Sequence, residues 1–514
     1  MFIKVALLVV FFAVTIFVGL YFRSRADSVS GFVLAGRSVG PWLTAFAYGT
    51  SYFSAVVFVG YAGQFGWRFG TAATWIGLAN AFIGSLLPWL ILGRRTRIMS
   101  HHLNSSTMPE FFGQRFNSTA LKIGASVLVF IFLIPYTASL YNGLSRLFSM
   151  AYGVDFTVCI MAMAVLTAVY VIAGGYFATA VNDFIQGIIM LVGIVTVLGA
   201  VISSNGGFAA AIAGLANVSD PAVNPGAYTS FFGPDPLSLL GVMILTSLGT
   251  WGLPQMVGKF YAIKSEKSIT IGAIISTFFS LIVAGGCYFL GSFGRLYADR
   301  VNIAAGGFDS IIPTILSGFP DALIGLIIIL VLSASISTLS ALVMTSASTF
   351  TLDFLKGNVV KKFSEKGQLL TIRALVVVFI VIASIIATIQ YRGGITFIAQ
   401  LMGISWGALA GSFLAPFLYG LYWKRTTGAS IWACFGFSTV LMVTNIFFRA
   451  SFPPILQSPI NAGAFAMLAG MVIVPVVSLL TKVKDKDAVE SHFSCYDETI
   501  TVKVRDDLGE EANG

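Results

Sequence analysis

The sequence has few charged residues, few cysteines and few histidines, and the low charge excludes an ordinary soluble domain. Charged residues make up only 10% of the 514 residues, whereas soluble domains contain about 25%. Hydrophobic residues make up 57%, and the mean hydropathy is +0.89. About thirteen apolar runs are each long enough to cross about 30 Å of hydrocarbon. They lie at about 3–22, 42–66, 70–93, 121–150, 154–173, 178–202, 235–262, 270–295, 316–350, 368–388, 393–422, 427–447 and 461–481. This pattern predicts an all-α polytopic membrane protein.

Motifs of common enzymes are also missing. The sequence contains no G-x-x-x-x-G-K-[ST] and no H-E-x-x-H. The segment 403–407 matches G-x-S-x-G, but it lies in an apolar run without a histidine, and a hydrolase elbow needs histidine and acid partners. The four cysteines have no paired spacing, so neither a disulfide framework nor a metal site is expected. We therefore expect a protein that is not an enzyme and has no cofactor.

The positive charges are distributed unevenly between alternate loops. With the N-terminus outside, 23 of the 30 Lys and Arg residues fall in inside loops and in the C-terminal tail, and Lys259, Lys264 and Lys267 are assigned to one of these loops. The long outside loop 203–234 carries none. The positive-inside rule produces this bias, so we expect a multi-pass protein of the cell membrane with a cytoplasmic C-terminus. The basic pI then reflects topology, and the expected partner is membrane lipid rather than nucleic acid.

One apolar run, 316–350, becomes rich in hydroxyl groups. Ser333, Ser337 and Ser340 follow i, i+4, i+7 spacing and share one helix face, and Thr338 lies beside it. One interpretation is helix packing, because small hydroxyl residues let neighbouring helices approach closely. The other is a row of oxygen ligands for a dehydrated Na⁺. The segment alone leaves both interpretations open.

Two other runs are interrupted near their middle. The run 42–66 contains Gly49, Thr50, Ser51 and Ser54, and the run 235–262 contains the sequence Gly249-Thr250-Trp251-Gly252-Leu253-Pro254. Two interrupted helices five spans apart are typical of inverted-repeat transporters, whose midplane site the unwound backbone lines. We therefore consider a solute site formed by Ser54, Tyr136, Thr250, Trp251, Gly252, Leu253 and Trp406.

Asp183 is the carboxylate most deeply embedded in an apolar run. An aspartate in the middle of a membrane helix costs about 2.5–3.5 kcal/mol on insertion scales, so it is expected to have a partner or to lie on a transport path. The alternative is hydration near the inner interface.

Several motifs together resemble the sodium:solute symporter family, which includes sodium/glucose and sodium/proline carriers. The resemblance runs from about residue 32 to about residue 427. Its motifs are Phe32–Gly40, Gly174-Gly175 with Asn182-Asp183 and Gln186-Gly187, Ser333-Ala334 with Ser337-Thr338-Leu339 and Asp353, and Pro416 with Trp423-Lys424-Arg425 and Gly428-Ala429. It implies alternating access by a leucine-transporter-like core of five plus five inverted-repeat helices.

The resemblance also implies a domain organisation. An extra N-terminal helix and linker would occupy residues 1–30, and the transport core would occupy residues 31–425, with repeats at 31–202 and 235–425. Two further helices would follow at 426–482, and a cytoplasmic tail at 483–514. One copy of the chain is expected to suffice for transport.

The family's common Na⁺ site maps onto five residues of this sequence. It would use the carbonyls of Thr50, Phe53 and Ala334 and the hydroxyls of Ser337 and Thr338. Family members that bind a second Na⁺ use the acid equivalent to Asp183 and hydroxyls about one turn further along the serine helix. Ser340 matches one of these, but the next position is Ala341, which puts a second cation in doubt.

The same resemblance narrows the solute. Residues 249–259 are most similar to the proline and pantothenate branch of the family. Tyr52 and Phe53 stand where proline carriers have Asp and Met, which disfavours proline. Val56 and Val57 replace residues that are polar in sugar carriers, which disfavours a sugar. We expect import of a small organic solute, either a carboxylate or an amino-acid-like molecule.

Two alternatives to a Na⁺-coupled symporter remain at this point. A symporter driven by H⁺ would use Asp183 as its proton carrier. A membrane sensor with a transporter-like core would need an output domain, and the segment 483–514 is too short for one.

Overall fold

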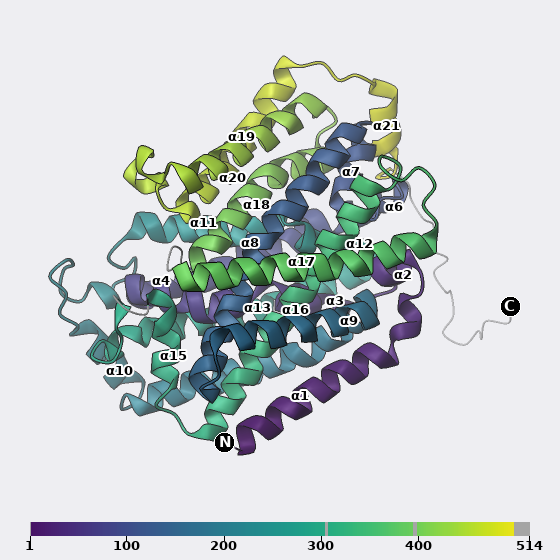
Figure 1. Cartoon of the computed structure of the whole chain (residues 1–514). Coiled ribbons are helices and arrows are strands. Elements are labelled where there is room, and N and C mark those ends of the chain that lie inside the picture. The colour runs from purple at the N-terminus through teal and green to yellow at the C-terminus, as the bar shows by residue number, and fades with distance from the viewer. Residues whose placement is uncertain (1, 304–306, 394–397, 498–514) are drawn as a thin grey trace, which may run out of the picture.

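The computed structural model of the chain describes residues 2–303, 307–393 and 398–497, and these residues form a helical bundle without a β-sheet (Figure 1). Its first half contains α1 (Phe2–Tyr21), α2 (Val29–Leu34), α3 (Pro41–Tyr52), α4 (Ala62–Phe69), α5 (Thr74–Ala81), α6 (Arg94–His102), α7 (Met108–Arg115), α8 (Thr119–Tyr152), α9 (Phe156–Ser204) and α10 (Phe208–Ala216). Its second half contains α11 (Pro236–Gly252), α12 (Pro254–Tyr261), α13 (Glu266–Ser292), α15 (Ile311–Leu316), α16 (Asp321–Thr349), α17 (Glu365–Gly393), α18 (Ile398–Tyr422), α19 (Gly428–Phe447), α20 (Pro459–Leu480) and α21 (Lys486–Ser494). The all-α prediction is confirmed.

The number of spans depends on how the longest helical stretches are counted. In the described residues, ten stretches are long and apolar enough to cross a membrane, or eleven if α11 and α12 form one bent span. Two of the ten, Val56–His102 and Phe156–Ser204, have 47 and 49 residues and a length of about 70 Å, more than twice the hydrocarbon thickness. Each contains a glycine with positive φ, Gly70 at +62° and Gly175 at +57°. Divided at these glycines, the described stretches give about thirteen spans.

The contacts of α1 show that the chain turns back at Gly175. Gly174 packs against Gly19 near the end of α1, and the Asn182 side chain donates to the Thr15 carbonyl one turn earlier along α1. Beyond Gly175 the chain therefore runs back along α1. α9 thus supplies two limbs, and its second limb places Asp183 in the interior.

Two helices are broken inside the bundle. The first breaks at Phe53 and Ser54, between α3 and the π-helix η3 (Val56–Tyr61). The second breaks at Leu253, where α11 and α12 meet at an angle of 42°. The interruptions expected in the two runs are therefore present. Both breaks are buried, which the bilayer requires of irregular backbone.

The hydroxyl-rich helix α16 lies at the centre of the bundle. In the most apolar part of the span Asp321–Leu355, 83% of the residues are buried. In the most apolar part of the span Glu365–Arg392, which lies in α17, only 33% are buried. α16 packs against α9, α8, α1 and α3. Its small Ala and Ser side chains let these neighbours approach closely. A helix in this position serves as a scaffold against which the broken helix α3 is held.

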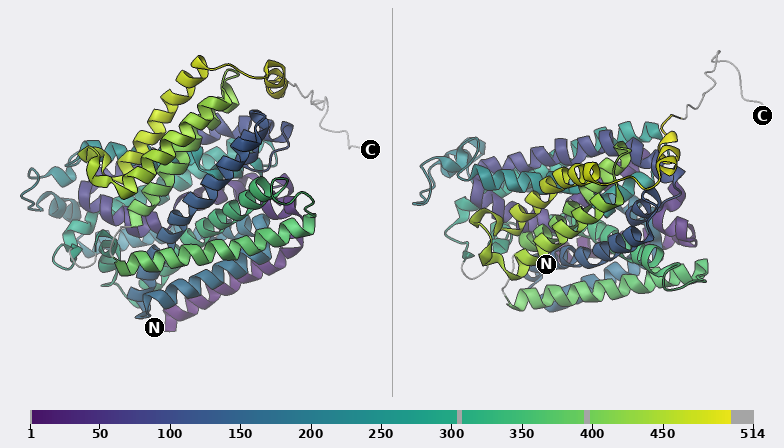
Figure 2. Two further views of the ribbon diagram at one scale, coloured as in Figure 1. Left: turned by 45° about the horizontal axis from the view of Figure 1, so that its top comes forward. Right: turned by 90° about the horizontal axis from the view of Figure 1, so that it is seen from above.

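The two ends of the bundle carry different helices (Figures 1 and 2). One end, which we call the basic end, carries α6, α7 and α21, and the opposite end carries α10 and α15. α1 begins at the opposite end, where Lys4 forms an ion pair of 2.9 Å with Asp321. α21 lies at the basic end, where the Tyr496 hydroxyl that follows it donates to the Arg95 carbonyl. The first and the last described residues therefore lie at opposite ends.

Candidate ion and solute site

The first break leaves carbonyl groups at the end of α3 without helical partners. Phe53 has extended backbone (φ −109°, ψ 115°), so the last carbonyls of α3 have no helical N–H above them. On the other side of the break, the Ala55 N–H donates to Ser335 Oγ of α16 at 3.2 Å. α16 thus holds both sides of the break, and its hydroxyl replaces a lost backbone partner.

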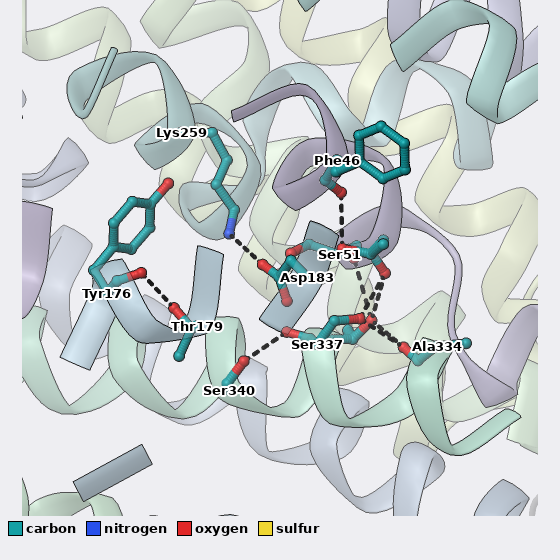
Figure 3. A network of polar contacts seen from close by, with 11 residues as sticks. Phe46, Ser51, Tyr176, Thr179, Asp183, Lys259, Ala334, Ser337 and Ser340 are labelled. Carbon is teal, nitrogen blue, oxygen red and sulfur yellow. Dashed lines mark hydrogen bonds and ion pairs between the residues drawn. The ribbon is translucent and has the colours of Figure 1, made fainter. Parts of the chain in front are cut away.

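Two hydroxyls of α16 meet the end of α3 directly (Figure 3). Ser337 Oγ lies 3.1 Å from the Thr50 carbonyl, and Thr338 Oγ1 lies 3.3 Å from it and 3.4 Å from the Ser51 carbonyl. The same two hydroxyls lie 3.1 Å and 3.0 Å from the Ala334 carbonyl. Five oxygens from two helices therefore gather in one buried cluster. We call Thr50, Ser51, Ala334, Ser337 and Thr338 the oxygen cluster.

Four of the five expected Na⁺ ligands belong to this cluster. The exception is Phe53, which lies at the break itself and whose ring stacks on Tyr52 with 4.3 Å between centroids. Instead of the Phe53 carbonyl, the structure places the Ser51 carbonyl beside Thr338. Ser51 was expected to interrupt the apolar run but not to supply a ligand, because the exact residue at which a helix unwinds cannot be read from composition.

Asp183 has a partner that sequence analysis assigned to an inside loop. Lys259, in the last turns of α12, places its Nζ 3.9 Å from Asp183 Oδ2, and the two side chains are only 4% and 1% exposed (Figure 3). The assignment of Lys259 to a loop was wrong. The other oxygen of Asp183 has no hydrogen-bond partner among the described residues. Ser340, the other residue considered for a second cation, donates to the Ser337 carbonyl at 2.8 Å.

The pair lies close to the oxygen cluster. Gly187, one turn after Asp183 on α9, packs so tightly on α3 that an added Cβ would lie 2.3 Å from the Phe46 ring and 3.1 Å from Thr50 Cγ2. α9 thus touches the turn of α3 that supplies the carbonyls. The Lys259 ammonium also lies 5.1 Å from the centroid of the Tyr176 ring, whose π-face attracts a cation.

A narrow cavity of about 60 Å³ leads away from this pair. Lys259, Tyr176 and Thr179 line it near the pair, and Ser106 and Thr107 line it beside α7 of the basic end. A cavity of this size accepts a few water molecules. It therefore forms a small, partly polar space between Lys259 and the basic end.

The expected solute residues divide into three groups. Tyr136 and Trp406 form one group with Tyr52: the Trp406 ring stacks on Tyr52 at 6.1 Å and meets Tyr136 edge-on at 5.9 Å. The Tyr136 hydroxyl and the Trp406 indole nitrogen are buried, and the Tyr136 hydroxyl faces the side chains of Ser54 and Trp406 without forming a hydrogen bond of ordinary geometry. Both groups therefore keep hydrogen-bonding capacity inside the bundle.

The residues around the second break bind other helices instead of joining the group of Tyr136 and Trp406. The Thr250 hydroxyl donates to the Gly84 carbonyl at 2.8 Å, and the Trp251 indole donates to the Ile83 carbonyl at 2.9 Å. Both side chains are therefore held by η5 (Phe82–Leu86). Gly252 packs on α18, where an added Cβ would lie 2.6 Å from the Leu414 nitrogen. These contacts hold the second break against its neighbours.

Two further expected residues lie at the breaks themselves. Leu253 is the extended residue between α11 and α12 and is fully buried. Ser54 Oγ accepts from the Val56 N–H at 3.2 Å, so it caps the restarting helix. In the structure, Leu253 and Ser54 thus make their contacts with the backbone and with neighbouring helices.

Family membership follows from comparison with known proteins. The sequence model of the "Sodium:solute symporter family" matches residues 32–435, more than half of the chain. The chain belongs to this family. Two curated relatives are the "Osmoregulated proline transporter OpuE" of Bacillus subtilis, 27% identical over 92% of this chain and 94% of the relative, and the "Sodium/proline symporter" of Staphylococcus aureus, 27% identical over 98% and 96%. The sodium:solute symporters are transporters rather than enzymes, and Na⁺ is their coupling ion.

Solved structures confirm the leucine-transporter-like fold. A Na⁺-coupled sialic acid symporter in a substrate-bound outward-open state aligns with a TM-score of 0.74 at 17% identity, over 94% of this chain and 98% of the other. The nucleobase-cation symporter Mhp1 in a closed conformation aligns with a TM-score of 0.52 at 14% identity, over 90% and 98%. At these identities the likeness concerns the fold.

Proposed function

We propose that this sodium:solute symporter imports a small carboxylate or amino-acid-like solute together with one Na⁺ ion. The observation that supports this most directly is the contact of Ser337 and Thr338 with the Thr50 carbonyl across the first break. A cation held there joins two helices that are distant in sequence. Its binding and release therefore change how the broken helix sits on α16, which is what alternating access requires.

The chemistry of the oxygen cluster fits a dehydrated alkali cation. Carbonyl and hydroxyl oxygens are hard ligands, and the carbonyl end of a half-helix carries a partial negative charge. At present the hydroxyls of Ser337 and Thr338 donate to carbonyls. When Na⁺ binds, those protons turn away and the same oxygens face the ion. The Phe53 carbonyl is the remaining ligand that the family comparison suggests.

Lys259 supports a stoichiometry of one Na⁺. A second Na⁺ site would use Asp183 and Ser340, yet the Lys259 ammonium already lies 3.9 Å from the Asp183 carboxylate. A resident positive charge neutralises the carboxylate and repels another cation. The chain also has Ala341 where a second site would need a hydroxyl. We propose that Lys259 takes the place of the second ion.

The proposed solute site lies among the aromatic residues next to the first break. Tyr136 and Trp406 offer two buried donors that lie next to each other, and Tyr52 supplies a flat wall. A half-helix, α12, begins at Pro254 directly after the second break, and its positive end would favour a solute that carries a carboxylate. Ser54, Thr250, Trp251, Gly252 and Leu253 would shape this site through the backbone that they hold.

The solute that we propose differs from the proline named for the curated relatives. Both relatives named above are proline carriers, whereas Tyr52 and Phe53 replace the Asp and Met of such carriers. The Tyr52 hydroxyl donates to the Thr246 carbonyl at 2.6 Å, and its ring covers Trp406. We propose an aromatic-walled site for a solute with a carboxylate and a less compact body than proline.

The proposed orientation places the N-terminus outside and the basic end in the cytoplasm, with repeats at 31–202 and 235–425. Inward movement of one positive charge across 100 mV yields about 2.3 kcal/mol. This is enough for roughly fortyfold accumulation of a neutral solute. A single Na⁺ is thus a sufficient driving force for an amino-acid-like zwitterion, which has no net charge. With a carboxylate anion no net charge moves, and the Na⁺ concentration gradient alone drives uptake.

Thermal stabilisation of the purified protein tests this proposal. Amino acids including proline, monocarboxylates, pantothenate and sugars are each added in Na⁺ and in K⁺. A ligand that binds only the folded state raises the melting temperature. We expect one carboxylate-bearing class to stabilise in Na⁺ and not in K⁺. Equal stabilisation in K⁺ would contradict the oxygen cluster as the coupling site, and stabilisation by sugars alone would contradict the solute class.

A further inference from the structure

A second cavity, unrelated to the transport path, opens at the basic end of the bundle. It has a volume of about 390 Å³ and lies where α8, α19 and α21 begin. Its lining includes Arg115, Ser118, Thr427, Lys482, Lys484 and His492. We call this cavity the basic pocket. One carboxylate, that of Asp485, also lines it, and this side chain caps α21 by accepting from the Ala488 N–H.

The most buried cation of the basic pocket is incompletely paired. Arg115 is 2% exposed, and its Nε donates to the Gly420 carbonyl at 3.1 Å and one terminal nitrogen to the Trp423 carbonyl at 3.5 Å. The other terminal nitrogen is buried and has no hydrogen-bond partner among the described residues. No carboxylate within the described ranges forms an ion pair with Arg115. A buried guanidinium with a free N–H edge is a strong attractor for an oxyanion.

The neighbours of Arg115 fix the plane of its guanidinium. The Phe116 ring lies 5.0 Å and the Phe493 ring 4.9 Å from its central carbon. Burial lowers the pKa of Arg115 to about 10, so the group stays charged at neutral pH. A planar, immobilised and charged guanidinium loses little entropy when it binds a second partner.

Two long helices also begin at the basic pocket. Ser118 and Thr427 are the N-caps of α8 and α19, which have 34 and 20 residues. The N–H groups and the positive end of the dipole at such termini favour an anion. Lys482 and Lys484 follow α20, where a membrane protein of this orientation meets the inner headgroup layer. Arg115, the two helix termini and the two lysines thus line one volume.

We infer that the basic pocket binds a phosphate-bearing anion, held by Arg115 and the N-termini of α8 and α19, with Lys482 and Lys484 at its rim. The ligand is the phosphate headgroup of an anionic lipid or free phosphate, and both present the same oxygens. A ligand here contacts α7, α8, α19 and α21 together. It therefore fastens the terminal helices to the transport core without touching the oxygen cluster.

The test uses the purified full chain, delipidated in a neutral detergent. Phosphatidylglycerol, phosphatidylcholine and inorganic phosphate are titrated separately, with melting temperature and native mass spectrometry as readouts. The main variant is Lys482→Gln with Lys484→Gln, and its matched control is Lys361→Gln with Lys362→Gln, two exposed lysines elsewhere in the chain. A third variant, Arg115→Gln, removes the buried donor.

We expect the phosphate-bearing anion to stabilise the natural chain and the control equally. In the Lys482 and Lys484 variant the half-saturating concentration should rise roughly thirtyfold, as loss of two surface charges implies. Arg115→Gln should abolish the effect if it folds. Stabilisation by inorganic phosphate assigns free phosphate as a sufficient ligand, and stabilisation by phosphatidylglycerol alone assigns the lipid. Equal responses in the double-lysine variant and the control, or no response to either anion, would overturn the inference.

Discussion

Lys259 of α12 and Asp183 of α9 face each other at 3.9 Å in the interior of the bundle. One belongs to the second half of a broken helix and the other to the limb that packs on the first broken helix. The pair therefore connects the two elements that the transport cycle is expected to move. It also sets the charge of the place where a second cation would bind.

The first prediction concerns the stability of this pair. Asp183→Asn and Lys259→Gln each leave one buried charge without its partner, which costs about 3–5 kcal/mol in a buried ion pair. Each single variant should therefore melt at a clearly lower temperature. The double variant removes both charges and should recover most of the loss. Additive losses in the double variant would show that the two groups do not interact.

The second prediction concerns the oxygen cluster. Ser337→Ala and Thr338→Ala each remove a cation ligand, and a hydrogen-bonding contact to a charged group contributes about 1.5–3 kcal/mol. The Na⁺ concentration for half-maximal uptake should therefore rise roughly tenfold or more in each variant. Ser346→Ala is the matched control, because Ser346 is a buried serine of the same helix outside the cluster. An unchanged Na⁺ dependence in both cluster variants would remove the site assignment.

The third prediction concerns close helix packing beside the first broken helix. A Cβ at Gly66 would lie 2.0 Å from the Gly291 carbonyl carbon, so Gly66→Ala must push α4 away from α13. We expect a strong loss of thermal stability and of uptake. Gly436→Ala is the control, since a Cβ at Gly436 meets no atom within 4 Å. Similar melting temperatures for both variants would contradict the packing that the structure shows.

The fourth prediction concerns the loop at the opposite end. The Asp220 carboxylate accepts from the Tyr228 hydroxyl at 2.6 Å and from Arg295 at 2.8 Å. Arg295 in turn donates to the Trp67 carbonyl at 2.8 Å, which ties the loop to α4. Asp220→Asn should increase hydrogen exchange around Tyr228. Arg300→Ala, at an exposed arginine, should not.

The same contact has a defined pH dependence. The Tyr228 hydrogen bond, an N–H from Ala222 and Arg295 hold the pKa of Asp220 below its usual value. The contact is then fully present above the unfolded pKa of about 3.9 and is lost as the pH falls through the lower folded value. Protection around Tyr228 should therefore stay constant from about pH 7 to about pH 5. A loss of protection in that interval would contradict this assignment.

Much of the fold could be predicted from the sequence because the bilayer imposes length and burial. Apolar runs gave the spans, and glycine-rich interruptions gave both broken helices. The hydroxyl spacing on α16 left helix packing and ion binding open, and the family resemblance then indicated Ser337 and Thr338, which the structure brings to Thr50. These features depend on local pattern, so a single sequence contains them.

Other parts depend on tertiary contacts and could not be predicted. The positive-inside rule placed Lys259 in a loop, because a lysine near a predicted helix end is usually solvated. Only the packing of α12 against α3 and α16 turns it towards Asp183. The expectation that Asp183 needs a partner was the signal in the sequence that could have identified Lys259. The sequence predicted only a tail at 483–514, whereas residues 486–494 of this segment form α21 and line the basic pocket.

The ratio of Na⁺ to solute tests the central claim most directly. Purified protein in liposomes is given radiolabelled Na⁺ and the solute identified by thermal stabilisation, and initial fluxes of both are measured together. We predict one Na⁺ per solute molecule, because Lys259 supplies the second positive charge at Asp183. Two Na⁺ ions per solute would contradict the role of Lys259, and solute flux without Na⁺ flux would contradict coupling through Ser337 and Thr338.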